Sequence, residues 1–285
     1  MSPDLRRVLV ALDASASSRA ALEAAVRWAR RGDGEVVALF VEDDDLLRLA
    51  AWPRALAFPG RGGAPCELDP VAMGRELRAV ADRARRLAEE VTARTRVRVR
   101  FEWTRGRVVP TIVAAAREAE LVVLGRRTRA TARATLGTTA AAIAATLPAV
   151  LLLDEGETLE PPIVVVVDGT SAGRAALAFA DSLARRLDHG DDLGLRVIVV
   201  PASDGRPDPA AEAALTTLVA AGGHPTVHRV RRPDPASVAA AARLLGAHTT
   251  VLPRSLTAGP DATAWVTSAP GAVVVVDGAP SSRER

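Results

Sequence analysis

The segment from Leu121 to Thr139 carries the densest set of groups in the chain that could bind phosphate. It reads LVVLGRRTRATARATLGTT: an apolar run, a glycine, a loop with four arginines, and a second glycine before two threonines. Glycines let backbone amides approach an anion, guanidinium groups bind phosphate oxygens in pairs, and a helix start offers open N–H groups. No acidic residue occurs between Leu121 and Leu153. The segment is therefore either a phosphate cradle or a solvated Arg-rich loop.

The residue types that the chain lacks exclude several kinds of chemistry. All 37 basic residues among the 285 are arginine. A Walker-type lysine, a Schiff base and a lysine general base are thus excluded. Cys66 is the single cysteine, so one chain cannot form a disulfide or a multi-cysteine metal site. The histidines lie outside any metal-binding motif, and we predict no metal-ligating and no catalytic residue; they are His189, His224, His228 and His248.

Charge and hydropathy narrow the partners. The formal net charge is only +3 and aromatic residues make up 3% of the chain, which gives no stacking platform or basic face for nucleic acid. The longest apolar stretch, Ala140 to Leu153, contains Thr146 and Pro148, and the N-terminal apolar run is too short for a signal peptide. We expect no nucleic-acid or membrane association and a cytoplasmic location.

The two halves of the chain repeat one pattern. VLVALDASASSRAALEAAVRWARR, from Val8, aligns with IVVVVDGTSAGRAALAFADSLARR, from Ile163, so that Asp13 falls opposite Asp168. The halves also end alike, on PAVLLLD and GAVVVVD. We predict two tandem domains, residues 1–157 and a shorter one at residues 160–285.

Within each half, short β-branched runs alternate with longer Ala/Leu/Arg segments, which is typical of βαβ units and a parallel sheet. The fold class is therefore α/β: two tandem doubly wound domains, each with a five-stranded parallel sheet and helices on both faces. The expected strands of the first half are Val8–Leu12, Val36–Val41, Val97–Trp103, Leu121–Leu124 and Val150–Leu153, and its helices Ser17–Arg31, Val71–Ala93, Val108–Ala119 and Thr138–Thr146. Those of the second half are strands Ile163–Val167, Leu195–Val200, Thr226–Val230, Thr249–Leu252 and Val273–Val276.

Two patterns predict the sheet edges. In TRVRVRFEW, arginines alternate with apolar residues, as in an edge strand whose charges deter further pairing. Val150–Leu153 and Val273–Val276 are wholly apolar, and an unpaired edge of that kind invites aggregation. We therefore predict that these two strands pair with each other and form a pseudo-twofold, two-domain body.

The order of these motifs resembles the universal stress protein family. The strand ending at Asp13, the helix with SSRAAL, the glycine loop and the LPAVLLL ending look like one such domain, and VDGTSAGRAAL looks like a second. The resemblance implies the strand order 3-2-1-4-5 and dimers that often form through the last strand. It also implies ATP binding in many members, while others lack the nucleotide motif.

The resemblance assigns site residues to the loop. Nucleotide-binding members follow the pattern G-x2-G-x9-G-[ST]; Gly125 matches its first position and the pair Gly137 and Thr138 its last. Thr128 replaces the middle glycine, and the loop is one residue short. The remaining candidates are the charged and hydroxyl side chains beside these glycines, namely Arg126, Arg127 and Thr139.

Two further positions are carried over, each with an alternative. Asp13 matches the acidic residue near the ribose, but it could simply hold the strand-to-helix turn while Ser15 or Ser17 caps the helix. Val41 matches the apolar residue whose backbone meets the base, but it could simply be core. In the second half Pro253 replaces Gly125, and Asp261 falls where Thr138 would be. A carboxylate opposes phosphate, so that site is expected to be degenerate.

One segment, residues 42–69, belongs to the first half alone. It is aromatic and Pro/Gly-rich, and we expect a surface loop with a short helix at Leu46–Ala51 that forms a lid, a partner surface or a plain excursion. The acidic run from Glu42 to Asp45 could bind Mg²⁺ or be a solvated turn.

Three functions remain, in order of preference. The first is a regulatory module that binds ATP, with Mg²⁺, or a related phosphate ligand in the first domain. The second is a stress-response scaffold without a nucleotide, acting through a homodimer or an unknown protein partner. The third is an ATP-hydrolysing enzyme. It ranks last because the motif loops of this sequence contain no group of carboxylates that could act as a general base or bind a metal.

Overall fold

The structure is a computed structural model that describes residues 7–30, 34–57, 64–93, 95–126, 137–187, 194–202 and 205–278. Its main strands in the first half are β1 (Arg7–Ala11), β2 (Glu35–Asp43), β5 (Arg98–Gly106), β6 (Leu121–Gly125) and β7 (Ala149–Leu153). Those in the second half are β8 (Ile163–Val167), β9 (Leu195–Val199), β10 (Thr226–Arg229), β11 (Thr249–Pro253) and β12 (Ala272–Val276). All ten expected strands are present.

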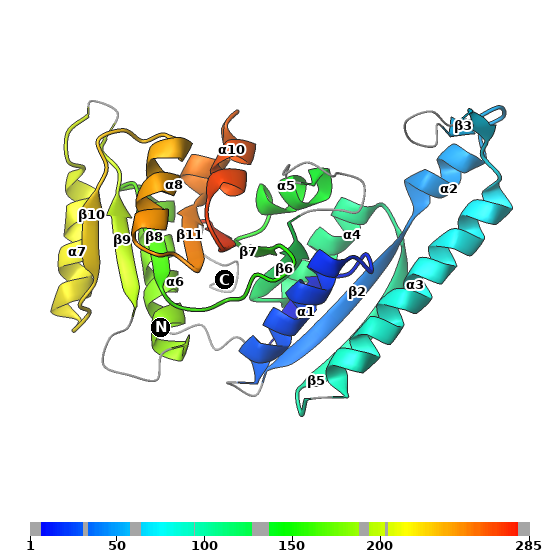
Figure 1. Cartoon of the computed structure of the whole chain (residues 1–285), viewed down its shortest axis with the longest axis horizontal. Helices are drawn as coiled ribbons and strands as arrows, with labels where there is room; N and C mark the ends of the chain where they lie inside the picture. Colours follow the sequence, from blue (N-terminus) through cyan, green and yellow to red (C-terminus); the bar gives the residue numbers. More distant parts are fainter. Residues whose placement is uncertain are drawn as a thin grey trace.

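These strands form one sheet in the order β10-β9-β8-β11-β12-β7-β6-β1-β2-β5, with the two halves side by side (Figure 1). Each half has the order 3-2-1-4-5 and is parallel throughout. The halves join where β12 runs antiparallel to β7, with Val274 opposite Leu151. The predicted pairing of the two terminal strands is thus confirmed. It leaves neither of these apolar strands as an unpaired edge of the sheet.

Helices cover both faces of the sheet. The first half has α1 (Ala16–Ala29), α3 (Pro70–Thr92), α4 (Val108–Ala115) with a 3-10 turn at Ala116–Glu118, and α5 (Thr138–Ala144). The second half has α6 (Ser171–Leu187), α7 (Pro209–Ala220), α8 (Pro235–Leu244), α9 (Arg254–Thr257) and α10 (Ala262–Ser268). One apolar layer joins the sheet to α1, α3, α6 and α7, and a second joins it to α4, α5, α8 and α10. This is the doubly wound arrangement that the alternation of elements predicts.

The seam between the halves, where β7 pairs with β12, is also covered by packed helices on one face of the sheet. Trp28 of α1 stacks on Phe179 of α6, with ring centroids 6.5 Å apart and planes within 7° of parallel. The guanidinium group of Arg186 lies 6.0 Å from the Trp28 ring. The halves therefore share one core layer rather than meeting only along two strands.

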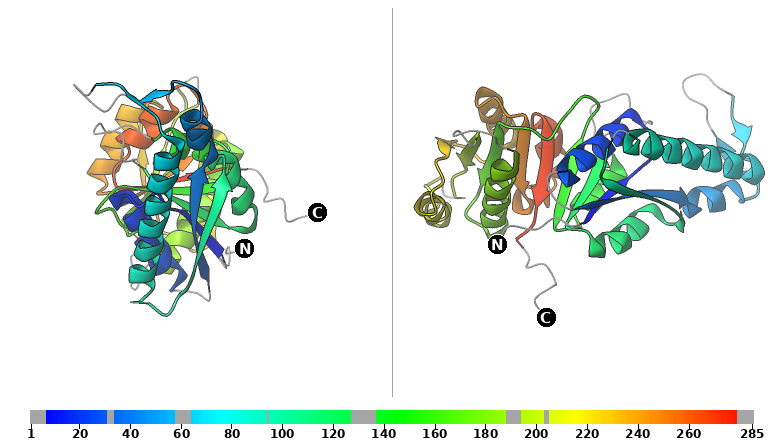
Figure 2. Two further views of the ribbon diagram at one scale, coloured as in Figure 1. Left: turned by 90° about the vertical axis from the view of Figure 1, so that its right-hand side faces the viewer. Right: turned by 90° about the horizontal axis from the view of Figure 1, so that it is seen from below.

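The described parts of residues 42–69, namely 42–57 and 64–69, build an arm. The expected short helix is α2 (Asp44–Ala50), and a hairpin of β3 (Leu56–Ala57) and β4 (Cys66–Glu67) follows, which the sequence did not predict. Asp69 is the N-cap of α3. The first helical residue, Pro70, has no N–H, so none is left without a partner at this position. The arm projects beyond the sheet together with the first turns of α3 (Figures 1 and 2).

The outer strand β5 is the predicted edge, with β10 as the edge of the other half. On β5, Phe101 faces α3, where the guanidinium group of Arg85 lies 5.5 Å from its ring. Arg98 and Arg100 are exposed. Among the described residues, no helix combines the length and the apolar character needed to cross a membrane.

Candidate functional site

The candidate site lies where the chain reverses its winding direction. β1 pairs with β2 on one side and with β6 on the other, and the connections from β1 and β6 lead away from each other. Ala11 is opposite Leu39, and Val10 is opposite Val123. Asp13, Val41 and Gly125, each two residues further along, therefore lie at the same carboxyl edge, which is where open α/β sheets bind ligands.

The turn after β1 is built around the Asp13 carboxylate. Oδ1 accepts a hydrogen bond from the Ser15 N–H at 2.9 Å, and Ala14 between them has a left-handed φ of 58°. The Ser15 hydroxyl oxygen in turn accepts from the Ser18 N–H at 3.1 Å and caps α1. Asp13 thus has the turn-forming role given above as its alternative. Its other oxygen, Oδ2, accepts no hydrogen bond from any residue that the structure describes.

Gly125 is required by packing. A Cβ at this position would lie 2.9 Å from the Cβ of Ser17, 3.2 Å from its carbonyl carbon and 3.3 Å from the Ser18 nitrogen. The end of β6 is therefore pressed against the first turn of α1, which brings the backbone after β6 next to the Asp13 turn.

Arg126 does not face this site. The side chain is buried, its guanidinium group donates to the Gly271 carbonyl across the seam, and it forms ion pairs with Glu157 at 3.2 Å and Asp154 at 3.8 Å. This corrects the expectation that Arg126 contacts a phosphate: the two carboxylates and the carbonyl hold it at the boundary with the second half. Arg127 and the rest of the loop, residues 127–136, lie outside the described residues.

The far end of the loop returns to the site. The Gly137 N–H donates to the Arg126 carbonyl at 3.2 Å, so the start of α5 lies beside the end of β6. No side chain caps α5, Thr138 is exposed and Thr139 is half-buried. The first turn of α5 therefore presents a hydroxyl group near the carboxyl edge.

The position of Val41 fits both interpretations given above, a core residue and a residue whose backbone contacts the base. It is half-buried and packs against the apolar layer under α4 and α5, as the core interpretation requires. It also lies near the carboxyl end of β2, opposite Thr104 of β5 and beside the Asp13 turn, as a base-contacting residue would.

The equivalent site of the second half is closed by its own side chains. Asp168 accepts at Oδ1 from the Thr170 N–H (3.2 Å) and hydroxyl (2.7 Å), and at Oδ2 from the Ser255 hydroxyl. Gly278, just past β12, lies so close to the first turn of α6 that a Cβ would collide with the backbone of Ser171. Ser255 was not identified from the sequence, because its loop does not align with the glycine loop of the first half.

Two carboxylates of the acidic run at the end of β2, Asp44 and Asp45, form ion pairs with arginines. Asp44 pairs with Arg105 at 2.8 Å and with Arg48 at 2.7 Å, and Asp45 pairs with Arg107 at 3.3 Å. These contacts favour the solvated-turn interpretation of the run over a Mg²⁺ site. Within the described ranges, no group of three or more His, Cys, Asp or Glu side chains is placed to hold a metal ion.

Comparison with known proteins decides the family. The model described as "Universal stress protein family" matches residues 4–153, more than half of the chain. The chain belongs to the universal stress protein family. A search of curated proteins returned no match.

Solved structures with a similar fold match the chain over nearly its whole length. A universal stress protein from Archaeoglobus fulgidus DSM 4304 superimposes with a TM-score of 0.66 at 16% identity, covering 95% of this chain and 96% of that one. A putative universal stress protein from Pseudomonas aeruginosa UCBPP-PA14 gives 0.57 at 17% identity, covering 96% and 93%. A functionally unknown protein from Pseudomonas aeruginosa PAO1 gives 0.56 at 18% identity, covering 96% and 92%. At these identities the likeness concerns the fold, and it extends over both halves.

Proposed function

We propose that this universal stress protein is a regulatory module whose first half binds ATP or a related phosphate-bearing ligand. Asp13 would bind the ribose, and the backbone at Val41 would contact the base. Gly137, Thr138 and Thr139, at the start of α5, would bind the phosphates. Magnesium would arrive with the nucleotide. Arg126 is left out of this set because the seam holds its side chain.

The contrast between Asp13 and Asp168 carries the proposal. The two aspartates follow equivalent strands, yet among the described residues Asp168 accepts hydrogen bonds at both carboxylate oxygens while Asp13 accepts at Oδ1 alone. Asp13 is half-buried, and a carboxylate oxygen that accepts no hydrogen bond from the described residues is suited to a ligand hydroxyl; such a hydrogen bond to a charged group contributes about 1.5–3 kcal/mol. This difference supports a ribose contact at Asp13 of the first half rather than at Asp168 of the second.

The test uses matched isosteric variants. An Asp13→Asn side chain keeps an oxygen for the Ser15 N–H and so preserves the turn, but it replaces Oδ2 by an amide donor. In calorimetry with ATP and Mg²⁺ at near-physiological salt, we expect one-site binding by the wild type and a loss of roughly 10- to 100-fold in Asp13→Asn. Asp168→Asn is the control and should leave the affinity unchanged.

Two outcomes would overturn the proposal. Absence of binding by the wild type would mean that the shortened loop is no nucleotide cradle. Equal losses in Asp13→Asn and Asp168→Asn would mean that binding does not use the switch point of the first half. Turnover of bound ATP, measured as phosphate release, separates the regulatory role from an ATP-hydrolysing one.

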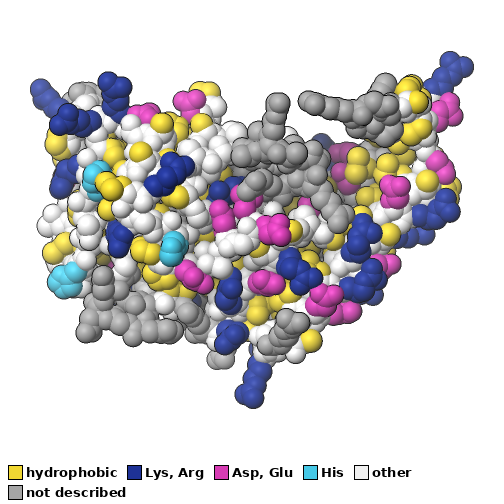
Figure 3. Space-filling view, viewed as in Figure 1, with side chains coloured by type: hydrophobic (Ala, Val, Ile, Leu, Met, Phe, Trp, Pro, Cys, Tyr) yellow, Lys and Arg dark blue, Asp and Glu magenta, His cyan; other side chains and the backbone are white. Residues whose placement is uncertain are grey.

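The arm supports a second candidate, a scaffold that acts through self-association. Five of the eight exposed large apolar side chains among the described residues lie on the arm or at the start of α3: Leu46, Leu49, Trp52, Leu56 and Val71. Ala50 is the buried residue of α2, whereas Leu46 and Leu49 of the same short helix are exposed. Hydrophobic side chains are visible on the arm in the space-filling view (Figure 3). Exposed apolar surface of this kind marks contact sites.

Sedimentation velocity over a wide concentration range tests this candidate. The wild type should associate as its concentration rises, and a Leu49→Ser, Trp52→Ser double variant should stay monomeric. Leu244→Ser, at an even more exposed leucine of the second half, is the matched control and should associate as the wild type does. A wild type that stays monomeric throughout rules the candidate out.

A further inference from the structure

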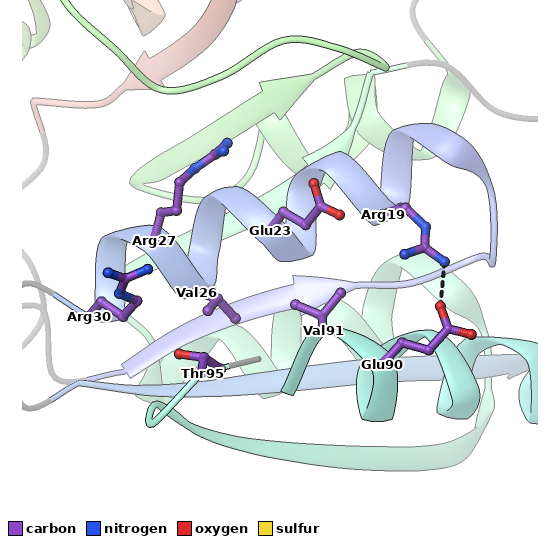
Figure 4. A pocket seen from close by; sticks show the side chains of 8 residues that line it. All are labelled: Arg19, Glu23, Val26, Arg27, Arg30, Glu90, Val91 and Thr95. Carbon is purple, nitrogen blue, oxygen red and sulfur yellow. Dashed lines mark hydrogen bonds and ion pairs between the residues drawn. The ribbon is translucent and has the colours of Figure 1, made fainter. Parts of the chain in front are cut away.

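A groove runs between α1 and α3, on the outer side of the first half. It consists of two adjoining hollows of about 270 Å³ each, which share Arg19 and Glu90. The Arg19 guanidinium and the Glu90 carboxylate meet across the groove at 2.7 Å, and Val26 and Val91 lie between the two helices (Figure 4). Neither hollow contains a residue assigned above to the nucleotide, although one begins at Ala14 and Ser15 next to Asp13.

The walls of the groove are strongly basic. Five arginines line it, against two glutamates, Glu23 and Glu90: Arg19, Arg27 and Arg30 come from α1, and Arg83 and Arg86 come from α3. Only Arg19 has a carboxylate partner within the described part of the chain. Elsewhere, arginines such as Arg105 and Arg229 are paired with acidic neighbours. Among the described residues, the guanidinium groups of the other four arginines of the groove have no carboxylate partner; two of them line each hollow, where they can bind an external anion.

The shape of the groove favours an elongated ligand over a single small anion. Arg19 and Arg30 are eleven positions apart on α1, which corresponds to about 16 Å along the helix axis. An extended peptide covers this distance with about five residues. The floor is apolar, because Val26 and Leu87 are buried and Val91 is half-buried there. A ligand that fills the groove needs both carboxylates and apolar side chains.

We propose that the groove between α1 and α3 binds an acidic, amphipathic peptide segment of a partner protein. Carboxylates of the segment would bind the guanidinium groups of Arg27, Arg30, Arg83 and Arg86, and its apolar side chains would lie on Val26, Leu87 and Val91. A phosphate polymer fits less well, because Glu23 and Glu90 interrupt the positive wall. Nucleic acid fits less well again, because no aromatic residue lines the groove for a base to stack on.

The experiment uses a fluorescein-labelled peptide of about ten residues in which Glu and Leu alternate, titrated with the full-length protein and followed by anisotropy. A peptide with Lys in place of Glu is the probe control. Arg83→Glu with Arg86→Glu should weaken binding of the Glu/Leu peptide at least tenfold. Arg231→Glu with Arg232→Glu makes the same charge change at exposed positions of the second half and should alter it less than about twofold. Both pairs are on the surface, and equal urea midpoints confirm that both variants fold.

Three results would overturn the proposal: equal binding of the Glu and Lys peptides, equal losses in the two double variants, or inorganic polyphosphate that binds tighter than the peptide in a manner dependent on Arg83 and Arg86. The last result would reassign the groove to phosphate polymers. Asp13→Asn should bind the Glu/Leu peptide normally, so failure of the nucleotide site leaves this inference standing.

Discussion

The guanidinium group of Arg126 donates a hydrogen bond to the main-chain carbonyl of Gly271, across the seam where β7 pairs with β12. The same guanidinium forms ion pairs with Asp154 and Glu157 in the segment that joins the two halves. The equivalent arginine of the second half, Arg254, pairs with Asp277 at 2.9 Å. Each half thus anchors the residue after its fourth strand to the residue after its fifth, and Arg126 adds a tie to the other half.

We expect Arg126→Ala to cost about 3 kcal/mol of unfolding free energy, because it removes the ion pair with the buried carboxylate of Asp154. Arg254→Ala should cost less, since Asp277 is 27% exposed and water can replace the arginine there. Urea denaturation of both variants measures the difference. An Arg126→Ala loss no larger than that of Arg254→Ala would show that the burial of Asp154 does not raise the cost of losing its arginine.

Much of the fold follows from local patterns in the sequence. Most of the ten main strands are short apolar runs, β5 is an alternating one, and the pairing of Val150–Leu153 with Val273–Val276 follows from the cost of leaving apolar edges open. The β3–β4 hairpin was missed because two-residue strands carry no alternation to detect. The spacing of Arg19, Glu23, Arg27 and Arg30 on one face of a helix was visible in the sequence, but their groove depends on α3 lying alongside.

The candidate site was predictable in place and not in detail. Asp13, Val41 and Gly125 lie at or near the carboxyl ends of neighbouring strands, so parallel pairing alone brings them to one edge. Whether an arginine next to that edge faces the ligand or the seam depends on carboxylates far along the chain, and the sequence does not order them in space. Arg126 turned inward because the joining segment supplies Asp154 and Glu157.

Ala14 is expected to store strain in the turn after β1. Its φ of 58° costs an L-residue about 1–2 kcal/mol, and the equivalent residue of the second half is Gly169, with φ of 75°. Ala14→Gly should raise the unfolding free energy by about 0.5–1 kcal/mol, after allowance for the greater freedom of glycine in the unfolded chain.

Gly169→Ala is the reciprocal variant for this turn. It should lower the unfolding free energy by at least about 2 kcal/mol, because it adds the same strain and a Cβ that collides with the Asp208 carboxylate. Denaturation curves of both variants measure the effect. A destabilised Ala14→Gly would show that the Ala14 methyl group makes packing contacts worth more than the strain.

Stability should depend on pH through Asp234, the N-cap of α8. The Ser237 N–H donates to its Oδ1 at 2.9 Å and the Ser237 hydroxyl to its Oδ2 at 2.7 Å, and these bonds lower the pKa of Asp234. A lowered folded-state pKa stabilises the protein above the unfolded-state pKa of about 3.9, and this contribution disappears as the pH falls through the folded-state pKa.

Asp234→Ala should therefore cost about 1 kcal/mol at pH 7 and progressively less below about pH 4. Asp234→Asn retains a capping oxygen without a titrating group, so its stability relative to the alanine variant should not change with pH. Urea midpoints at pH 7 and at about pH 3 test both statements. A pH-independent gap between the wild type and Asp234→Ala would exclude the carboxylate as its source.

The requirement for glycine at position 125 can be separated from any ligand. Gly125→Ala places a methyl group 2.9 Å from the Cβ of Ser17, and the first turn of α1 must move to admit it. We expect a loss of about 1–3 kcal/mol in the absence of nucleotide.

Adding Ser17→Gly to Gly125→Ala removes the nearest atom and should recover part of this loss, even though Ser17→Gly alone destabilises α1 by about 1 kcal/mol. A double-mutant cycle on urea denaturation measures the coupling between the two positions. Strictly additive effects would mean that β6 and α1 are not in contact here, and the glycine would then have to be explained by the loop alone.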